Sequence, residues 1–400
     1  MSERGLVFDT SPRRLAPGWL ATRVRGSRPP AGGPLTLRDI DPPPPPGPDW
    51  VPLRPRHAGI CGSDVQQVLL RADTDNPLSG LISFPHVMGH EIAAQIAEEH
   101  ENAGVWVAVN PWIGCAVRGR EPCPACRAGS PAHCAHVTEP VLAGRTGSGM
   151  HLGNVAGLPG GFATRMVAHR SQCVPLPEGL EPAAAVLADP LAVGLHAVCQ
   201  ARIQATDGTA LVLGAGTIGL CVAAALRERH PHLRVFVSAA WSGQVAEVGG
   251  LGAEAVPVAA GALVDVLAQR VDAPVVRPWL GRPWLAGGGV DAVVDAVGSA
   301  GTLETALRVV RPRGRVVRVG VGRAGRLQST LAYFKEVEVA GSNGYGPAEL
   351  RAALELLAGS RVPHRRWRTH TFPFDEWRHA FEVAATPQKS GAIKVSLEVD

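Results

Sequence analysis

The sequence predicts an α/β protein with two domains, and three observations support this fold class. The chain has 400 residues, too long for one typical domain, and 46% of them are hydrophobic, enough to bury two cores. From residue 181 to about residue 341, short apolar runs alternate with helical patterns, as in a parallel sheet covered by helices. A glycine motif joins the first of these runs to a helix. We therefore expect a β-rich domain at 1–178, a parallel-sheet domain at 179–341 and a return segment at 342–400.

The elements are expected in the following order. The first sixty residues indicate short strands broken by proline and glycine, and residues 81–110 indicate further strands, with a helix start at most near His90. Residues 111–140 are rich in Cys, Gly and Pro, which indicates a loop that needs something other than a core to hold it. Helices are expected at 183–200, broken at Asp189-Pro190, and at 347–358. Buried strands of the parallel sheet are expected at 211–213, 235–237 and 292–294, and a further strand is expected at 316–319.

Composition and charge argue against several classes of protein. Only 18% of the residues are charged and the formal net charge is +4, which argues against disorder and against a general affinity for nucleic acid. We interpret the basic run at 311–326 as a solvated turn beside a strand. Residues 208–226 carry no charge, but the glycines at 214, 216 and 219 interrupt them, so we expect a core segment and not a membrane span. Residues 1–14 lack the apolar stretch of a secretory signal, so we expect a cytoplasmic protein whose eight cysteines bind metal or are buried thiols.

The glycine motif predicts a dinucleotide site. Residues 211–219 read Leu-Val-Leu-Gly-Ala-Gly-Thr-Ile-Gly, after an apolar strand and before an Ala-rich helix, which is the context this motif requires. Gly214 permits a tight turn, Gly216 lets the backbone approach a pyrophosphate, and Gly219 lets the helix pack closely on the strand. The helix start at Thr217 and Ile218 offers backbone N–H groups to the anion.

The end of the following strand bears on the choice between NAD and NADP. Ser238 and Ala239 stand there, with no acid to hold a ribose 2′-hydroxyl and no Arg to hold a 2′-phosphate. The missing carboxylate removes a repulsion against the 2′-phosphate, and Ser238 or Ser242 could donate to it. We expect NAD or NADP as cofactor, with a slight preference for NADP.

The first candidate metal set is Cys61 in the segment Cys61-Gly62-Ser63-Asp64, with His90-Glu91 downstream and Asp189-Pro190 later. Thiolate, imidazole and carboxylate suit zinc, and three protein ligands leave a fourth position open for substrate. Taken singly, Cys61 would more often be a buried thiol and His90 a core histidine.

Four further cysteines form the second candidate set, which is spaced C-x7-C-x2-C-x7-C: Cys115, Cys123, Cys126 and Cys134. Four thiolates in a loop without a core suit a closed structural zinc site. A redox pair at Cys123 and Cys126 is the alternative, although no thioredoxin-like pattern surrounds it. The remaining three, Cys173, Cys199 and Cys221, are expected in the core.

With these motifs the chain resembles the zinc-containing medium-chain dehydrogenase/reductase family, in particular its alcohol, sorbitol, threonine and glucose dehydrogenase branches. The resemblance covers nearly the whole chain and rests on the following segments: Gly59-Ile60-Cys61-Gly62-Ser63-Asp64, Gly89-His90-Glu91, Gly160-Gly161-Phe162-Ala163, Asp189-Pro190-Leu191-Ala192-Val193, Asp295-Ala296-Val297-Gly298 and Gly391-Ala392-Ile393-Lys394-Val395. It implies a Rossmann doubly wound parallel-sheet domain and a β-rich GroES-like catalytic domain, which the return segment completes.

The resemblance also implies residue roles. Cys61, His90 and Asp189 would surround a catalytic zinc, with Glu91 beside it as an outer or transient ligand. Ser63 would touch the substrate oxygen and start the proton relay, while Asp64 would hold the His90 imidazole. Among the cofactor contacts, Lys394 would reach the pyrophosphate, and the others expected are Val297, Gly298 and Val319.

Three positions depart from the family pattern. Asp189 stands where most relatives of this branch have Glu, so it binds zinc directly or through water. Gln66 replaces a relay His, which puts the proton route in question. Arg120 stands where the first cysteine of the structural set is usual, and Cys115 substitutes for it if residues 116–120 bulge; otherwise that zinc is lost.

The resemblance implies a zinc-dependent, NAD(P)-dependent alcohol dehydrogenase or ketone reductase. We expect a small-molecule substrate, a secondary alcohol that is polyol-, cyclitol- or sugar-like, and a homodimer or homotetramer that binds neither nucleic acid nor membrane. One alternative is an epimerase-like enzyme of the same fold that oxidises its substrate transiently. Another is a non-catalytic NAD(P)-binding protein.

Overall fold

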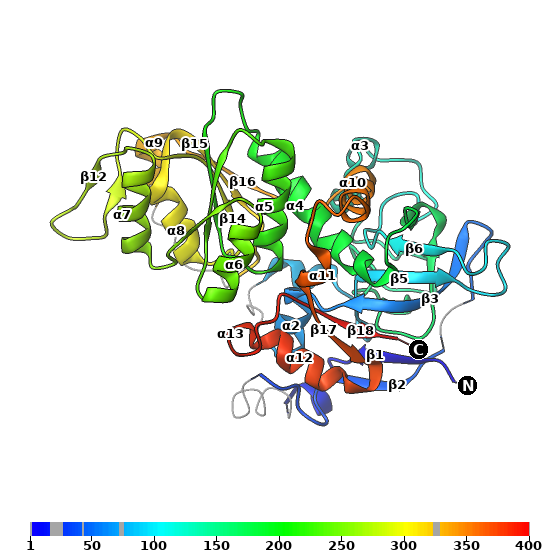
Figure 1. Cartoon of the computed structure of the whole chain (residues 1–400). Helices are drawn as coiled ribbons and strands as arrows, with labels where there is room; N and C mark the ends of the chain where they lie inside the picture. Colours follow the sequence, from blue (N-terminus) through cyan, green and yellow to red (C-terminus); the bar gives the residue numbers. More distant parts are fainter. Residues whose placement is uncertain (1, 17–26, 42–43, 72–75, 323–328, 400) are drawn as a thin grey trace. The chain divides into compact units, whose positions relative to one another are not determined.

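The computed structural model describes residues 2–16, 27–41, 44–71, 76–322 and 329–399 and divides the chain into two compact units (Figure 1). Unit 1 consists of Met1–Asp189 and Gly344–Asp400, and unit 2 consists of Pro190–Asn343. Residues 179–189, which we expected in the parallel-sheet domain, thus belong to unit 1. The reason is that the 3-10 helix η4 (Pro182–Leu187) packs against β3 and β5 of that unit.

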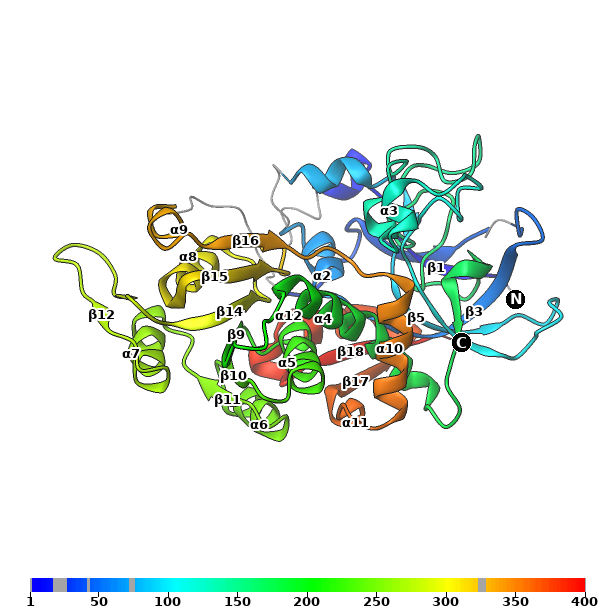
Figure 2. The ribbon, with the colours of Figure 1, turned by 90° about the horizontal axis from the view of Figure 1, so that it is seen from above.

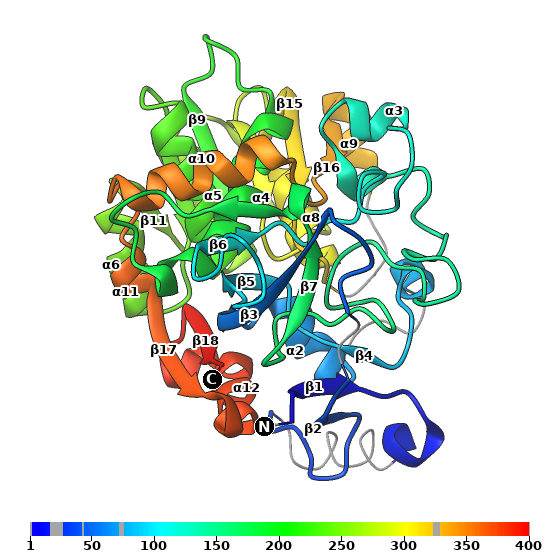
Figure 3. The same ribbon diagram turned by 90° about the vertical axis from the view of Figure 1, so that its right-hand side faces the viewer.

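The strands of unit 1 pair mainly antiparallel in two sheets. The seven-stranded sheet has the order β17-β18-β3-β5-β6-β8, with β7 also paired to β3, and the three-stranded sheet has the order β2-β1-β4. The strands are β1 (Arg4–Phe8), β2 (Leu35–Asp39), β3 (Trp50–Gly59), β4 (His86–Val87), β5 (Glu91–Ile96), β6 (Trp106–Val109), β7 (Met166–His169), β8 (Cys173–Pro175), β17 (Arg368–Pro373) and β18 (Lys394–Glu398). The return segment therefore supplies β17 and β18 to the main sheet (Figure 3).

Short helices and turns connect these strands. They are α2 (Gly62–Val68), η1 (Pro77–Leu81), α3 (Pro124–Arg127), η2 (Pro131–His133), η3 (Arg170–Gln172), η4, α10 (Pro347–Ala358), α11 (His364–Trp367), η5 (Phe374–Glu376), α12 (Trp377–Ala385) and α13 (Pro387–Ser390). The apolar face of α12 buries Trp377, Ala380 and Phe381 against β17 and β18. Residues near both ends of the chain, including Leu6 and Leu397, belong to the same hydrophobic cluster, so the return segment is part of this core.

Unit 2 is a parallel sheet with the order β11-β10-β9-β14-β15-β16, which Figure 2 shows in succession. Numbered along the chain, this is the 3-2-1-4-5-6 order of the doubly wound dinucleotide-binding fold. The strands are β9 (Thr209–Leu213), β10 (Arg234–Ser238), β11 (Glu254–Val256), β14 (Val290–Asp295), β15 (Val310–Arg318) and β16 (Glu338–Gly341). Leu211, Val212 and Val293 are fully buried, because helices cover both faces of such a sheet.

The helices of unit 2 lie on two sides of this sheet. They are α4 (Ala188–Ala201, whose first two residues belong to unit 1), α5 (Thr217–Arg229), α6 (Ser242–Gly250), α7 (Ala260–Arg270), α8 (Ala300–Val309) and α9 (Thr330–Lys335). Helices α5 and α6 pack together beside β9, β10 and β11, and α7 and α8 pack together on the other side (Figures 1 and 2). A hairpin of β12 (Val275–Val276) and β13 (Trp284–Leu285) precedes β14.

Most predicted elements match the structure, and several expectations are wrong. The helix expected at 183–200 does not break at Asp189-Pro190: α4 runs through both residues after η4, because Pro190 stands in its first turn, where its missing N–H costs nothing. The runs at 211–213, 235–237 and 292–294 lie in β9, β10 and β14, and the helix predicted at 347–358 is α10. No helix starts at His90, because Glu91 opens β5 and pairs with β3. Cys199 is not a core residue: it is exposed in the last turn of α4, where the Arg229 guanidinium donates to its sulfur. The other two expected core thiols differ, since Cys221 is buried and Cys173 is partly buried.

The apolar and basic segments flagged in the sequence have structural explanations. The uncharged residues 208–226 form β9 and most of α5. Within the described residues, one helical stretch, Pro182–Ala201, is long and apolar enough to cross a membrane, but most of it is buried and it is weak evidence of a span. The basic run is not the expected turn in its first half, because residues 311–318 belong to β15, which pairs with β14 and β16. There Arg311 pairs with Asp207 and Asp291, and Arg315 pairs with Glu338. Residues 323–328 of that run lie outside the described part of the chain.

Candidate active site, cysteine cluster and cofactor motif

The residues predicted to hold a catalytic metal lie at the ends of two paired strands. Cys61 follows β3 and caps α2, and His90 directly precedes β5. Because Gly59 pairs with Glu91 across these strands, Cys61 and His90 are brought together. The ligand atoms of Cys61, His90 and Glu91 lie within 4.8 Å of one another. A thiolate, an imidazole and a carboxylate at this spacing fit zinc.

Asp64 orients two of these groups. Its Oδ2 accepts a hydrogen bond from the backbone N–H of Cys61 at 2.9 Å, and its Oδ1 lies 3.5 Å from Nδ1 of His90. Burial alone would lower the pKa of His90, but the negative charges of Asp64 and Cys61 outweigh it and raise that pKa well above its ordinary range. The same charges favour a bound cation, and the contact at Nδ1 leaves Nε2 free to bind a metal.

Glu91 forms a buried ion pair with Lys394. The Lys394 ammonium donates to Oε1 and Oε2 of Glu91 at 2.7 and 2.5 Å and to the carbonyl of Ile60 at 3.2 Å. The two side chains are among the most buried charged groups, at 1% and 2% exposure. Burial lowers the pKa of Lys394, but the Glu91 carboxylate raises that pKa by a larger amount, so the net shift is upward. Glu91 and Ile60 thus accept its three hydrogen bonds within unit 1, and the contact of Lys394 with a cofactor pyrophosphate stays a prediction.

Asp189 lies near this group but has a different partner. It stands in the first turn of α4, and its Oδ2 accepts a hydrogen bond from the Tyr345 hydroxyl at 2.5 Å. Burial raises the pKa of Asp189 to about 6, and the charges of His90 and Glu91 also act on it. The tight ligand group thus contains Glu91, where the sequence placed Asp189.

Three aromatic residues around these ligands were missed by sequence reasoning. The ring centroid of His151 lies 5.0 Å from that of His90 and 5.4 Å from that of Trp112, which in turn lies 6.2 Å from Tyr345. His151 donates from Nδ1 to the Leu152 carbonyl and accepts at Nε2 from Asn154, and burial lowers its pKa to about 3. It is therefore a neutral wall of the site, and no local spacing could have indicated it.

Ser63 and Gln66 lie on the exposed side of α2. Both are exposed in its first two turns, while Asp64 between them is buried. The Ser63 hydroxyl, two residues from Cys61, is thus accessible to a ligand, as the prediction for Ser63 requires.

The four cysteines predicted to form a structural site converge. Their sulfurs lie within 4.8 Å of one another. Cys115 Sγ is 3.6 Å from Cys134 Sγ and accepts the backbone N–H of Cys123 at 3.3 Å, while Cys126 Sγ accepts the N–H of Cys115 at 3.4 Å. The Cys115 carbonyl accepts the N–H groups of Arg118 and Arg120, so the segment that begins at Cys115 turns back on itself. Four sulfurs at this spacing fit a tetrahedral zinc.

The clustered cysteines differ in the pKa of their thiols and in the charge beside them. The backbone N–H groups of Ala135 and Cys126 lower the pKa of Cys123 to about 6, whereas burial raises that of Cys126 to about 12. The Arg118 guanidinium, fixed by the carbonyls of Glu139 and Gly149, adds a positive charge beside Cys134 and Cys115. A metal ion would have to displace protons from the other thiols, so its affinity depends on pH.

In unit 2 the predicted cofactor residues gather at the carboxyl ends of neighbouring strands. Gly214 has a φ of +95°, and a Cβ on Gly219 would lie 1.7 Å from the Gly214 carbonyl oxygen, so this turn needs both glycines. Gly216 caps α5 and faces open space, so its backbone fits the approach of a pyrophosphate. The N–H of Gly214 donates to Ser238 Oγ at 2.8 Å, which joins the ends of β9 and β10.

The other predicted contacts lie at the ends of β14 and β15. A Cβ on Gly214 would meet the Val297 side chain at 2.6 Å, and one on Gly298 would meet the Gly320 carbonyl at 1.8 Å. Val319 donates its backbone N–H to the carbonyl of Asp295. Ala239 is partly buried directly after Ser238. These ends surround the switch in strand order between β9 and β14, where dinucleotides bind in such sheets.

Comparisons with known proteins agree with this geometry. Residues 47–178 match the alcohol dehydrogenase GroES-like domain and residues 217–359 match the zinc-binding dehydrogenase domain. D-xylulose reductase A of Aspergillus oryzae is 30% identical over 340 residues, which cover 82% of this chain and 85% of that protein. The chain belongs to the zinc-containing medium-chain dehydrogenase family. L-galactonate-5-dehydrogenase of Escherichia coli is 28% identical to this dehydrogenase over 84% of the chain and 88% of its own length.

A solved structure supports the fold of this medium-chain dehydrogenase. The 2R,3R-butanediol dehydrogenase of Bacillus subtilis superposes with a TM-score of 0.73 at 22% identity, over 100% of both chains. Membership of the family makes the protein an oxidoreductase that uses zinc and NAD(P).

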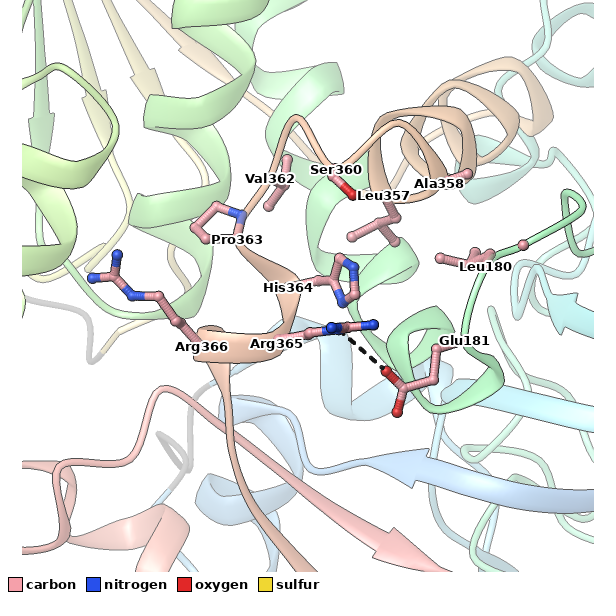
Figure 4. A pocket seen from close by; sticks show the side chains of 11 residues that line it. Leu180, Glu181, Leu357, Ala358, Ser360, Val362, Pro363, His364, Arg365 and Arg366 are labelled. Atoms are coloured by element: carbon pink, nitrogen blue, oxygen red, sulfur yellow. Dashed lines mark ion pairs between the residues drawn. The ribbon is translucent and has the colours of Figure 1, made fainter.

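A separate hollow of the dehydrogenase lies in unit 1 between the end of α10, α11 and residues 179–181. Its volume is about 360 Å³, and Figure 4 shows Leu180 and Leu357 on its apolar side. Arg365 reaches Glu181 at 3.9 Å, while Arg366 extends away from this pair (Figure 4). None of the candidate metal ligands lines it, so we assign it no part in the chemistry.

Proposed function

We propose that this dehydrogenase interconverts a secondary alcohol of a polyol-, cyclitol- or sugar-like molecule and its ketone, with NAD(P) as the hydride carrier. The observation that supports this most strongly is the convergence of Cys61, His90 and Glu91, with Asp189 close by. The names of the relatives, a xylulose reductase and a galactonate dehydrogenase, favour sugar-derived substrates.

The residues of the site divide the work. Cys61, His90 and either Glu91 or Asp189 would hold the zinc. Bound zinc supplies a Lewis acid for the substrate oxygen, and bound nicotinamide supplies the hydride acceptor or donor. Ser63, exposed two residues from Cys61, would relay the proton of the reacting hydroxyl by accepting it while its own hydroxyl proton passes to solvent water, and Asp64 keeps His90 in its ligating orientation.

The ion pair with Lys394 affects how strongly Glu91 can bind a metal. As long as the ammonium binds both carboxylate oxygens, Glu91 is a weaker competitor for the metal, which leaves a role for Asp189. A shift of either carboxylate would change the ligand set without moving Cys61 or His90.

For the cofactor we propose NADP with a shallow preference over NAD. Ser238 is 4% exposed and accepts from Gly214, so its own proton is free to donate, and Ala239 offers no carboxylate to a ribose. With no acid and no Arg at this position we expect discrimination of about tenfold. Ala239→Asp should turn the preference toward NAD, and unchanged ratios of kcat/KM for the two cofactors would place the ribose elsewhere.

Zinc analysis and a substrate panel test the function. The purified protein is assayed for nicotinamide reduction over polyols, sugar acids and simple secondary alcohols, with NAD and with NADP. His90→Ala should abolish turnover and remove zinc while the fold persists, and His232→Ala, an exposed histidine of unit 2, is the matched control. A zinc-loaded protein that binds NADP but oxidises nothing would contradict the proposal and favour a non-catalytic NAD(P)-binding protein. If the protein isomerised a substrate without net reduction of the nicotinamide, it would instead be an epimerase-like enzyme.

We also propose a cytoplasmic homo-oligomer, as expected from the sequence. Light scattering on the purified protein measures the number of subunits, and a monomer at micromolar concentration would contradict this expectation.

A further inference from the structure

We infer that Tyr345 is a positioning residue for the active site, because it fixes the Asp189 carboxylate, and that the cysteine-rich loop supports it in this role. The inference rests on the proposed function, since it assumes that Asp189 serves the metal or the substrate there.

The contact itself is short and buried. The Tyr345 hydroxyl donates to Asp189 Oδ2 at 2.5 Å, and the two side chains are 1% and 9% exposed. A hydrogen bond from a hydroxyl to a carboxylate in such a dry place is among the stronger ones in proteins. Because Tyr345 takes Oδ2, the carboxylate is held in one rotamer and Oδ1 remains for a metal ion, its water or the substrate hydroxyl.

The glycines on either side of Tyr345 fix the position of its backbone. Gly344 has a φ of +66°, and a Cβ there would lie 2.7 Å from atoms of Trp112 and Ala132. Gly346 caps α10, and a Cβ there would lie 2.2 Å from the carbonyl oxygen of Gly129. Tyr345 therefore sits between two glycines whose backbones press against the segment that carries the cysteines.

This packing connects the two candidate metal sites of unit 1. Gly129 and Ala132 lie between Cys126 and Cys134, so the cysteine cluster fixes the surface on which residues 344–346 rest. Trp112, whose ring lies edge-on to Tyr345, also lies edge-on to His151, the neighbour of His90. A disturbance of the cysteine-rich loop would thus reach Asp189 through Tyr345.

Tyr345→Phe tests the role, because it removes the hydroxyl and keeps the ring. The chain has one other tyrosine, Tyr333, which is 85% exposed on α9, so Tyr333→Phe is the matched control. We expect Tyr345→Phe to lower kcat by about 10- to 100-fold, as is common when a partner of a ligand is lost, with a smaller change in KM. The visible spectrum of the Co²⁺-substituted protein should change in this variant and not in the control.

A double variant separates positioning from packing. If Tyr345 acts through Asp189, adding Tyr345→Phe to Asp189→Asn should change kcat and zinc affinity by less than about threefold, since coupled residues are not additive. A further tenfold loss in the Asp189→Asn background would overturn the inference, because it would mean that the tyrosine acts elsewhere. So would a Tyr345→Phe protein with normal kcat and an unchanged Co²⁺ spectrum.

A measurement on the unmutated hydroxyl covers the case in which Tyr345→Phe does not fold. Because the chain has two tyrosines, fluorotyrosine labelling gives two fluorine NMR resonances. We expect one of them to shift on zinc addition and in Asp189→Asn, and the Tyr333 resonance to stay in place. A Tyr345 resonance that ignores both changes would refute the inference, whereas lack of dehydrogenase activity alone would refute only the proposed function.

Discussion

Lys394→Gln should destabilise unit 1 severely, because it leaves Glu91 without its counter-charge. Glu91 is 1% exposed, and its Oε1 and Oε2 accept from Lys394 at 2.7 and 2.5 Å. In this position the carboxylate cannot reach water, and it lies close against β3, since a Cβ at the facing Gly59 would be only 2.0 Å from Oε2. The comparison is made on the metal-free protein, in which no zinc beside Cys61 and His90 compensates the charge of Glu91.

The magnitude follows from breaking one partner of a buried pair, which costs about 3–5 kcal/mol. For a folding unit of this size each kcal/mol lowers Tm by about 2–4 °C, so the variant should melt roughly 6–20 °C lower. Replacing both charges, as in Glu91→Gln with Lys394→Gln, should recover most of the loss, because a neutral pair carries no uncompensated charge.

The pH dependence has a definite sign. The pKa of Lys394 is raised in the folded protein, so its contribution to stability is complete below the ordinary lysine pKa and is lost only as the pH rises through the higher folded value. The loss of unfolding free energy in Lys394→Gln, relative to the wild type, should therefore be constant between neutral pH and about pH 10.

Thermal unfolding followed by circular dichroism is the assay, with Lys389→Gln as control because Lys389 is exposed on α13. A Tm within about 2 °C of the wild type, less than 1 kcal/mol at this size, would refute the reasoning. A normal Tm combined with a strongly raised KM for the cofactor would instead support the original expectation that Lys394 contacts the pyrophosphate.

Two further predictions concern the cysteine cluster and a buried histidine. Cys115→Ser should lower the zinc content by about one ion per chain and, if zinc stands at about 1,000 times its Kd, lower the free energy of unfolding by roughly 4 kcal/mol. The control Cys173→Ser, outside the cluster, should keep the zinc content and the stability of the wild type. Equal zinc content in the two variants would contradict the assignment. Burial lowers the pKa of His86 to about 4, so the unfolded chain gains a proton first as the pH falls from 6.5 toward 4, and stability drops by about 1.4 kcal/mol per pH unit. Urea unfolding of His86→Gln should lack this contribution, and identical pH slopes for variant and wild type would contradict it.

The parts of the site that lie on local motifs could be predicted from the sequence. Gly214 and Gly219 are identifiable because a turn between a strand and a helix allows little else there, and the structure shows the close approach that excludes a side chain. Cys115 could be proposed because three other cysteines needed a fourth ligand. The strands of unit 2 were predictable because burial on both faces leaves continuous apolar runs.

The parts that depend on tertiary contacts could not be predicted. The pairs Glu91–Lys394 and Asp189–Tyr345 join residues 303 and 156 positions apart, and no periodicity relates such partners. The placement of Glu91 among the ligands follows from the register of β5 against β3, which the sequence does not specify to one residue. Exposure of Cys199 likewise depends on what covers the end of α4.

The three carboxylates of the site differ in the partner that each one holds. Asp64 is bound to a backbone N–H and the His90 imidazole, Glu91 to an ammonium, and Asp189 to a neutral hydroxyl. A carboxylate that is hydrogen-bonded to a neutral donor still attracts a further cation strongly, because its negative charge is not compensated. A carboxylate that is already paired with a cation attracts a further cation least. We therefore propose Asp189 as the carboxylate most available to a metal ion or a reacting hydroxyl, although Glu91 lies in the tighter group. Its pKa of about 6 means that it gives up its proton near neutral pH, where a cation beside it would complete the ionisation.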